Sequence, residues 1–545
     1  MTSRFLACSA ALLLAQTALV PPAAAAQPAT AQVAIDAAAA RHPINPLIYG
    51  VSYATTAQLE DLNAPLNRSG GDSASTYNWR QNARNAGKDW YFESLACTND
   101  IFDQHGDGFV ALTKAAGAQA MLTMPLLGWV ARLDADRKPL ASFSIGKYGL
   151  QEKTDLQGFV EAGNGKLLDG SPIVHNDPRD AMVRFGPEDA RDWMEHLVST
   201  WGLADKGGVR YYMMDNEPSF WHDIHRDVHP EGAHASEIAR KVRVFAEEVK
   251  DIDPGAKVVA PEEWGWTAYL YSGFDQQYAE QHGFENAPDR THETDGMDYL
   301  PWLLKQWKEA GHPVDVVSVH FYPQNKIYTE AGGDHSTAGE LLRNRLTRDL
   351  WDPDFTDPSW IHAKVDLIHR LRHWVDTYYY PGTPIALTEY NWGAEDTMNG
   401  ATAQADLLGI FGREGLDMAT RWATPPRTSP TYLAMKMYRN YDGHKSGFGA
   451  TSVSAKVADP DHLAAYAALR ADGALTVMVI DKDLSGRTRV DLALAHFPDH
   501  GSLERYQLAD GVLKALPSGR YTNSRLTATV PSPSVTLFVL KGPSP

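Results

Sequence analysis

The chain has few cysteines: its 545 residues contain only Cys8 and Cys97. Cys8 lies in an apolar stretch that follows Arg4 and precedes the alanines at 24–26. This is the pattern of a secretory signal peptide with a small-residue cleavage site, so residues 1–26 are predicted to be removed. Cys97 would then be alone, which excludes an intrachain disulfide. Stability outside the cell must come from a large buried core, which a chain of this length can form.

Basic residues are also under-represented. There are 50 lysines and arginines against 68 aspartates and glutamates, and the formal net charge is −18. Nucleic acids and anionic membrane surfaces are bound through basic patches, so neither is an expected partner. No later run is long and apolar enough for a membrane span. We therefore expect a secreted protein, extracellular or periplasmic, that is a monomer and is compatible with a neutral polymer as its substrate.

Short β-type runs alternate with amphipathic helical stretches through most of the chain. Within residues 235–251, for example, Ile238, Val242 and Phe245 recur at helical spacing. Eight strand-like runs occur, at residues 48–54, 65–69, 119–124, 209–215, 257–260, 314–321, 385–388 and 418–424. Eight strand–helix repeats predict an α/β fold, a TIM-like (β/α)8 barrel.

The alternation of strand-like and helical patterns ends near Tyr432. From there β-like runs are separated by turn signals such as Asp472-Gly473, which predicts an antiparallel β-sandwich. The predicted organisation is a signal peptide at 1–26, an N-terminal strand joining the sandwich at 27–44, the catalytic barrel at 45–430 and the sandwich at 431–545.

Two of the barrel strands end on a glutamate. Glu217 closes the run VRYYMMDNEP at 209–218, and Glu389 lies in PIALTEYNW at 384–392. Counting along the chain, these are the ends of strands four and seven, where a barrel carries its catalytic groups. A retaining glycoside hydrolase needs an acid/base and a nucleophile about 5–5.5 Å apart. We therefore predict Glu217 as the acid/base and Glu389 as the nucleophile; the alternatives are an exposed turn carboxylate and a buried structural pair.

Polar neighbours extend this predicted site. Asn216 can donate a hydrogen bond to a sugar 2-hydroxyl. Tyr390 is a suitable donor for orienting Glu389. His320 and Tyr322 close the sixth strand and are predicted to point into the same cleft, where they would position the nucleophile or the substrate. The alternative for His320 is a core histidine with a satisfied partner.

Metal binding is a further possibility to weigh. His222, His225 and His229 lie in WHDIHRDVHP, at spacings of three and four. A helix would place several of them near one cation, but no HExxH motif is present, so a cleft wall is the more economical interpretation. We expect no cofactor for catalysis; structural calcium through carboxylates such as Glu93 or Asp103 stays open.

Three long segments resemble glycoside hydrolase family 44. DNEPSFWHDIHRDVHP at 215–230 resembles the acid/base region of that family, and ALTEYNW at 386–392 its nucleophile strand. RSGGDSASTYNWRQNARNAGKDW at 68–90 is similar to its second-strand region. The resemblance implies a retaining endo-β-1,4-glucanase, often active on xyloglucan and soluble cellulose derivatives. It also implies a barrel with an appended sandwich.

Site residues follow from the matched motifs. The resemblance implies Glu217 as acid/base and Glu389 as nucleophile, with Asn216 touching the sugar at the cleavage site. Trp79, Trp392 and Trp422 are implied as sugar platforms. The family pattern has an asparagine after the glycine pair, where this chain has Asp72.

Other functions remain open at this point. The barrel is compatible with another β-1,4 polysaccharide, such as mannan, xylan or mixed-linkage glucan, because a fold does not fix the substrate. A non-catalytic polysaccharide-binding protein and a metal-dependent hydrolase are the remaining alternatives.

Overall fold

Eight parallel strands close a central barrel in the computed structural model, which describes residues 29–98 and 100–543. In chain order they are β3 (Gly50–Ser52), β4 (Leu66–Ser69), β7 (Gln119–Met124), β11 (Tyr211–Met214), β12 (Lys257–Glu263), β13 (Val316–Phe321), β14 (Ile385–Tyr390) and β15 (Met418–Arg421). Each of the eight predicted runs supplies one of these strands. The TIM-like barrel is therefore confirmed, and strands four and seven are β11 and β14. The predicted signal peptide, residues 1–26, lies outside the described residues.

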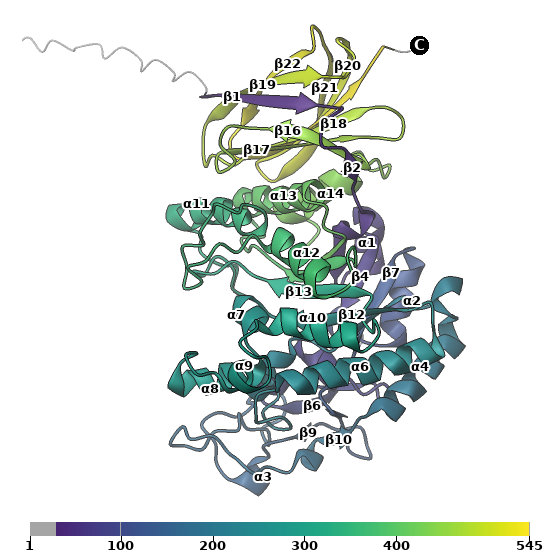
Figure 1. Cartoon of the computed structure of the whole chain (residues 1–545), viewed down its shortest axis with the longest axis vertical. Helices are drawn as coiled ribbons and strands as arrows, with labels where there is room; N and C mark the ends of the chain where they lie inside the picture. The colour runs from purple at the N-terminus through teal and green to yellow at the C-terminus, as the bar shows by residue number, and fades with distance from the viewer. Residues whose placement is uncertain (1–28, 99, 544–545) are drawn as a thin grey trace, which may run out of the picture.

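At least one helix follows each barrel strand and packs outside it (Figure 1). These helices are α1 (Thr56–Leu62), α2 (Asp107–Ala115), α4 (Pro187–Trp201), α6 (Ala235–Ile252), α10 (Tyr299–Glu309), α12 (Leu367–Tyr378), α13 (Met398–Arg413) and α14 (Pro430–Arg439). Helix α6 shows why the pattern works: Ile238, Val242, Phe245 and Val249 are buried at helical spacing, while its charged residues face outward.

A strand-rich unit packs against the α13–α14 side of the barrel (Figure 1). Its strands are β1 (Ala29–Asp36), β16 (Thr451–Lys456), β17 (Leu463–Leu469), β18 (Leu475–Asp481), β19 (Arg487–Ala495), β20 (Gly501–Ala509), β21 (Val512–Tyr521), β22 (Arg525–Pro531) and β23 (Ser534–Lys541). The strand order is β21-β20-β23-β18-β17-β16-β1-β19-β22. Strand β1 pairs with β16 antiparallel but with β19 parallel. It departs from the predicted antiparallel pattern because it arrives from the distant N-terminal segment, not through a hairpin.

The barrel continues further along the chain than predicted. Residues 430–439 form α14, which packs on α1 and α13, and the first long sandwich strand begins only at Thr451. The predicted boundary at residue 431 is therefore wrong by one helix. Pro430 at the first helical position and a Ser429 side chain that accepts from the Tyr432 N–H are the helix-start signals that place it.

The junction between the two units is buried and polar at its centre. Asp406 of α13 forms an ion pair with Lys482, at 2.8 Å, and accepts a hydrogen bond from the Tyr466 hydroxyl, at 2.7 Å. Both charged side chains are almost fully buried, so loss of either partner would leave an unpaired charge in the interface. This arrangement ties the sandwich to the barrel.

Extra segments surround the carboxyl ends of the barrel strands. The connection after β7 carries β8 (Trp129–Ala131), β9 (Leu140–Ala141), α3 (Ile145–Tyr148) and β10 (Met182–Arg184), and β9 joins a three-stranded sheet with β5 (Ala83–Asn85) and β6 (Glu93–Ala96). The connection after β13 carries α11 (Thr337–Leu346). Within residues 29–98 and 100–543, no helix has the length and apolar character needed to cross a membrane.

Candidate active site

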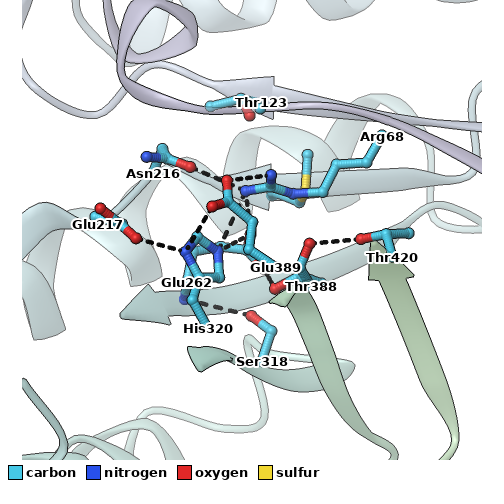
Figure 2. A network of polar contacts seen from close by, with 12 residues as sticks. Arg68, Thr123, Asn216, Glu217, Glu262, Ser318, His320, Thr388, Glu389 and Thr420 are labelled. Carbon is cyan, nitrogen blue, oxygen red and sulfur yellow. Dashed lines mark hydrogen bonds and ion pairs between the residues drawn. The ribbon is translucent and has the colours of Figure 1, made fainter. Parts of the chain in front are cut away.

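Charged side chains meet at the carboxyl ends of five barrel strands. Figure 2 shows Arg68 from β4, Glu217 just after β11, Glu262 from β12, His320 from β13 and Glu389 from β14. The strands deliver these residues to one place because parallel barrel strands all end on the same face. Residues far apart in the sequence, such as Arg68 and Glu389, are thereby brought into direct contact.

The two predicted glutamates lie close together. His320 Nδ1 is 2.8 Å from Glu217 Oε1 and 3.6 Å from Glu389 Oε2. One carboxylate oxygen of each glutamate and a ring nitrogen of His320 all lie within 4.8 Å of one another. A pair of carboxyls at this separation is too close to hold a water molecule between them for direct attack, and it suits one acid and one nucleophile.

Arg68 holds the nucleophile candidate in place. Its Nη1 lies 2.5 Å from Glu389 Oε1, and its Nη2 lies 2.9 Å from Glu262 Oε2 and 2.9 Å from Asn216 Oδ1. Glu262 in turn accepts a hydrogen bond from the Thr388 hydroxyl at 2.8 Å. Arg68 and Glu262 are fully buried, so their pairing keeps each from being an isolated buried charge.

The charges in the cluster shift the pKa values of its titratable groups in different directions. Burial favours the neutral form of Glu262, but the charge of Arg68 outweighs it and lowers the pKa of Glu262 to about 2. Burial also opposes charge on His320, yet Glu389, Glu217 and Glu262 together raise its pKa to about 10. Two cations, Arg68 and His320, thus face three carboxyls.

The pKa of Glu217 is shifted in the opposite direction from that of Glu262. Burial raises its pKa and Glu389 adds to that effect, while hydrogen bonding from His320 opposes it. A partly buried acid with a raised pKa beside a carboxyl group held by Arg68 and Tyr322 is the division of roles that glycosidic bond cleavage requires. The arrangement therefore provides a proton donor and a nucleophile on one substrate bond.

The backbone around Glu217 is strained and anchored. Asp215, Glu217 and Glu262 have φ values of 70°, 46° and 61°, in the left-handed region that non-glycine residues rarely adopt. The carboxylate of Asp215 is buried and accepts from the Ser75 hydroxyl at 2.6 Å and from the Trp221 indole at 3.0 Å. These contacts fix the turn that presents Asn216 and Glu217 to the cleft.

Tyrosine orients the nucleophile candidate, but a different tyrosine from the one beside it in sequence. The Tyr322 hydroxyl donates to Glu389 Oε2 at 2.8 Å. Tyr390 points away from the cleft: it accepts from Gln404 and packs on Phe411. The prediction for Tyr390 is wrong because successive side chains on a strand alternate between faces, so Glu389 and Tyr390 cannot both face the cleft.

Of the two roles predicted for His320, positioning the nucleophile or the substrate, its contacts fit the first. Its exposed fraction is 0%, and its ring nitrogens contact Glu217 and Glu262. It therefore positions and charges the carboxyl groups without reaching the substrate. Asn216 is also nearly buried, with its side-chain oxygen accepting from Arg68 and from the Gly71 N–H.

Two connected hollows lie at residues that directly follow β4, β14 and β15, on the face of the barrel that carries the glutamates. One, of about 470 Å³, is lined by Asp72, Asp89, Trp90 and other residues, and the second, of about 580 Å³, is lined by the segment around Tyr328. Trp422 and Phe102 border both, so they form one groove. Gly71 is required beside Trp422: its φ is +74°, and a Cβ there would lie 2.6 Å from the indole ring.

Two of the three tryptophans implied as sugar platforms are not in this groove. Trp392 is 2% exposed and packs near Phe321 inside the barrel wall. Trp79 stacks on His196 of α4, outside the groove. Those two implications are wrong, because the flat faces of both rings are covered by protein. Trp422 does line the groove, and so does Trp90, which is 39% exposed and was not selected from the sequence.

The histidines of residues 221–230 do not converge on a metal position. His225 Nε2 contacts the carbonyl of Asp72, at 3.1 Å, and His229 contacts the carbonyl of Glu231 and the Glu237 carboxylate. His225 and His229 thus have protein partners of their own, and His222 Nε2 lies 3.9 Å from a carboxylate oxygen of Glu280. His225 therefore supports the wall of the groove at Asp72.

The carboxylates considered for calcium have different surroundings. Asp103 is paired with Arg84 at 2.7 Å and accepts from the Thr98 hydroxyl. Glu93 is buried, and its Oε1 has no hydrogen-bond partner. Burial and the nearby Asp155 raise the pKa of Glu93 to about 8. Of the two, Glu93 is the residue with a buried carboxylate oxygen that lacks a hydrogen-bond partner.

Sequence reasoning missed Arg68 and Glu262 as members of the site. A usable signal was present in both cases: each is a charged residue at the carboxyl end of an apolar barrel strand, in LNRS and in VVAPEE. Charged residues at that end of a barrel strand point to the site more often than to the core.

Comparison with known proteins agrees with this geometry. A family model for glycoside hydrolase family 44 matches residues 83–325. The crystal structure of CelM2, a bifunctional glucanase-xylanase protein from a metagenome library, is 52% identical, covers 95% of this chain and 100% of that chain, and superposes with a TM-score of 0.92. A xyloglucanase of the same family from Paenibacillus polymyxa, solved with xyloglucan, is 27% identical over 94% of this chain and 100% of its own, with a TM-score of 0.75.

Endoglucanase A of Paenibacillus lautus is 29% identical over 576 residues, which cover 98% of this chain and 76% of that protein. The fold, the paired glutamates and these likenesses agree with one another. The chain belongs to glycoside hydrolase family 44 and is a glycoside hydrolase.

Proposed function

We propose that the protein is a retaining endo-β-1,4-glucanase that cleaves xyloglucan and soluble cellulose derivatives. The observation that carries the proposal is the placement of Glu217 and Glu389, whose nearest oxygens lie within 4.8 Å. This separation matches the about 5–5.5 Å between carboxyl groups in retaining enzymes and is shorter than the about 6.5–9.5 Å of inverting ones.

The proposed reaction has two displacements. Glu217 gives its proton to the glycosidic oxygen while Glu389 attacks the anomeric carbon, so the glycosidic bond breaks and an ester to Glu389 forms. Glu217, now ionised, removes a proton from water, and the water oxygen displaces Glu389 with net retention. Arg68 and Tyr322, bound to the two oxygens of Glu389, hold it for attack.

The experiment is hydrolysis of xyloglucan and carboxymethylcellulose with the initial product anomer read by NMR. Endo cleavage predicts a rapid fall in polymer viscosity at low reducing-end release. The β-anomer appearing first supports the mechanism, whereas the α-anomer appearing first rules it out whatever the polymer.

Xylan is a second candidate substrate. It is favoured by one observation: CelM2, at 52% identity, is described as a bifunctional glucanase-xylanase protein. Initial rates on xylan, mannan and mixed-linkage glucan, measured beside the two glucans, rank these polymers directly. A higher kcat/KM on xylan would make the glucans secondary.

Loss of the hydrogen bond from Tyr322 to Glu389 is expected to have an intermediate effect on activity. We expect Tyr322→Phe to lower kcat about 10- to 100-fold, because a hydrogen bond to a charged group contributes about 1.5–3 kcal/mol. The matched control is Tyr390→Phe, whose hydroxyl faces away from the cleft and should leave kcat within about threefold. Equal losses in both variants would contradict the orienting role of Tyr322.

We also propose that Glu93 and Asp155 hold a structural calcium ion. Support comes from the buried, unpartnered Glu93 Oε1 and from the neighbouring Asp155, since Ca²⁺ prefers carboxylate and carbonyl oxygens. Calcium in excess should raise the melting temperature by a few degrees over protein treated with EDTA, because a ligand at 100 times its Kd stabilises the folded state by about 2.7 kcal/mol.

The calcium prediction has a matched variant. Glu93→Gln should melt at the same temperature with calcium and with EDTA. An EDTA-treated wild-type protein that calcium does not stabilise would contradict the proposal, as would a calcium response that survives in the variant.

Export is proposed from the amino-terminal sequence. Residues 1–26 would direct secretion and be removed after Ala26. Amino-terminal sequencing of protein recovered from the medium or periplasm should begin at Gln27; a start at Met1 would contradict cleavage.

A further inference from the structure

A buried hydrogen bond joins the turn that carries Glu217 to the end of β12. Glu263 follows Glu262 at the end of that strand, and its side chain is fully buried. Ser219 lies two residues past Glu217, in the 3-10 turn Pro218–Phe220 (η7), and is fully buried as well. The Ser219 hydroxyl donates to Glu263 Oε2 at 2.5 Å. The reaction proposed above uses neither of these two residues.

A β-bulge explains why β12 delivers two consecutive carboxyl groups to this region. The register of β12 on β13 shifts between Pro261 and Glu263, so Glu262 is the extra residue, and its φ is 61°. A bulge changes the direction in which the neighbouring side chains point. Glu262 therefore contacts Arg68 at the barrel mouth, whereas Glu263 contacts Ser219.

The end of β12 also contacts the turn on either side of this hydrogen bond. The Glu217 N–H donates to the Glu262 carbonyl at 3.0 Å. The ring of Phe220 stacks on Trp264, with the ring centroids 4.5 Å apart. The hydrogen bond to Glu263 lies between these two contacts, so three consecutive residues of β12 and the loop after it hold the turn.

Close packing restricts the turn further. A Cβ on Gly273, the first residue of α8 (Gly273–His282), would lie 2.8 Å from the Ser219 carbonyl oxygen and 3.0 Å from its Cα. The Ser219 backbone is therefore in direct contact with α8 while its side chain is bound to Glu263. Glu217 has a φ of 46°, and a strained residue keeps such a conformation only when the surrounding structure holds it.

We propose that Glu263 is a positioning residue that, through the Ser219 hydroxyl, holds Glu217 where it can protonate the leaving glycosidic oxygen. The inference rests on the proposed function, because it concerns the acid role of Glu217. It goes beyond that function, since hydrolysis by Glu217 and Glu389 does not by itself require another carboxyl group bound to the turn.

The chemistry of Glu263 suits a neutral hydrogen-bond acceptor. Burial raises the pKa of Glu263 to about 8; the hydrogen bond from Ser219 opposes this rise, and Glu217 adds to it. At neutral pH the carboxyl group is therefore mostly protonated and can still accept from Ser219. Glutamine is then a close substitute, because it is neutral and has an oxygen in the same place.

The test is Ser219→Ala, which removes the hydroxyl and leaves Glu263 in place, assayed on two substrates. On carboxymethylcellulose, kcat/KM should fall about 10- to 100-fold, which is the effect of a misplaced catalytic group. On an aryl cellobioside with an acidic phenol, kcat/KM should fall less than about threefold, because that leaving group needs no acid catalyst. A purely structural defect would lower both values alike.

Two substitutions of Glu263 separate the hydrogen bond from the bulk of the side chain. Glu263→Gln keeps an oxygen that can accept from Ser219, so kcat/KM on carboxymethylcellulose should stay within about threefold of wild type. Glu263→Leu has no acceptor and should reproduce the two-substrate pattern of Ser219→Ala. Melting curves verify folding, and Ser219→Ala decides the question if Glu263→Leu does not fold.

A double variant measures whether Ser219 acts through Glu217. Adding Ser219→Ala to Glu217→Gln should change kcat/KM on carboxymethylcellulose by less than about twofold, because the acid that the hydroxyl positions is already absent. The matched control is Ser236→Ala. It removes an exposed hydrogen bond from a serine to Glu293, of 3.0 Å, near the start of α6, and should keep wild-type kcat/KM on both substrates.

The outcomes separate this inference from the proposed function. Wild-type kcat/KM of Ser219→Ala on carboxymethylcellulose overturns the inference and leaves the function intact. An equal fall on both substrates, equal losses in Glu263→Gln and Glu263→Leu, or additive losses in the double variant overturn it as well. Wild-type protein without activity on any β-1,4 polymer would instead remove the proposed function.

Discussion

Glu389→Gln is expected to lower kcat on β-glucan by about four orders of magnitude or more, as removal of a covalent nucleophile does in other hydrolases. The amide keeps the shape of the side chain but cannot form the glycosyl ester. Arg68 loses one of its two ionic partners, at 2.5 Å, so the variant also tests whether the site still folds around a neutral residue.

Reducing-end release from xyloglucan and carboxymethylcellulose measures this loss. The melting temperature and binding of cello-oligosaccharides should be retained, which distinguishes a missing nucleophile from a damaged fold. Glu309→Gln on the outer face of α10 serves as the matched control and should keep wild-type kcat. Activity of Glu389→Gln equal to wild type would mean that the nucleophile assignment is wrong, and binding without turnover by the wild-type protein would revive a non-catalytic role.

Glu217→Gln is expected to have the second largest effect, with a dependence on the leaving group. On polysaccharide, kcat/KM should fall about 10²–10⁴-fold, because a sugar hydroxyl must be protonated as it leaves. On an aryl cellobioside whose phenol is acidic, kcat/KM should fall less than about tenfold, since that leaving group needs no acid catalyst.

The pH dependence of this variant provides an independent readout. In wild-type enzyme, burial and Glu389 raise the pKa of Glu217, so the acid form persists above its ordinary range and activity falls as pH rises through the raised value. Glutamine cannot titrate, so the alkaline limb on the aryl substrate should disappear. Equal losses on both substrates, with the alkaline limb retained, would assign the proton donor to another group.

The cluster around these glutamates explains why both roles coexist at so short a distance. Arg68 and His320 place two positive charges among three carboxyl groups: Arg68 forms ion pairs with Glu262 and Glu389, and His320 contacts all three. Glu217 is partly buried, and burial and Glu389 raise its pKa. The acid and the nucleophile are both glutamates, and the surrounding charges at the barrel mouth give them different roles.

The sequence alone determined the architecture and the two central residues. Eight apolar runs of strand length are each followed by an amphipathic helix. Such patterns lie within short segments, so they can be recognised from the sequence alone. Glu217 and Glu389 could be selected because each ends such a run and a barrel places all those ends on one face. The sandwich was predictable for the same reason, from its closely spaced turns.

Only the tertiary structure decided which neighbours act on the glutamates. Trp79 and Trp392 lie in motifs that resemble a sugar site, yet packing covers both rings. Tyr322, two residues past His320, reaches Glu389 from the end of the neighbouring strand β13, whereas adjacent Tyr390 faces outward. Contacts between strands depend on the register and twist of the closed sheet, and no local pattern in the chain encodes those distances.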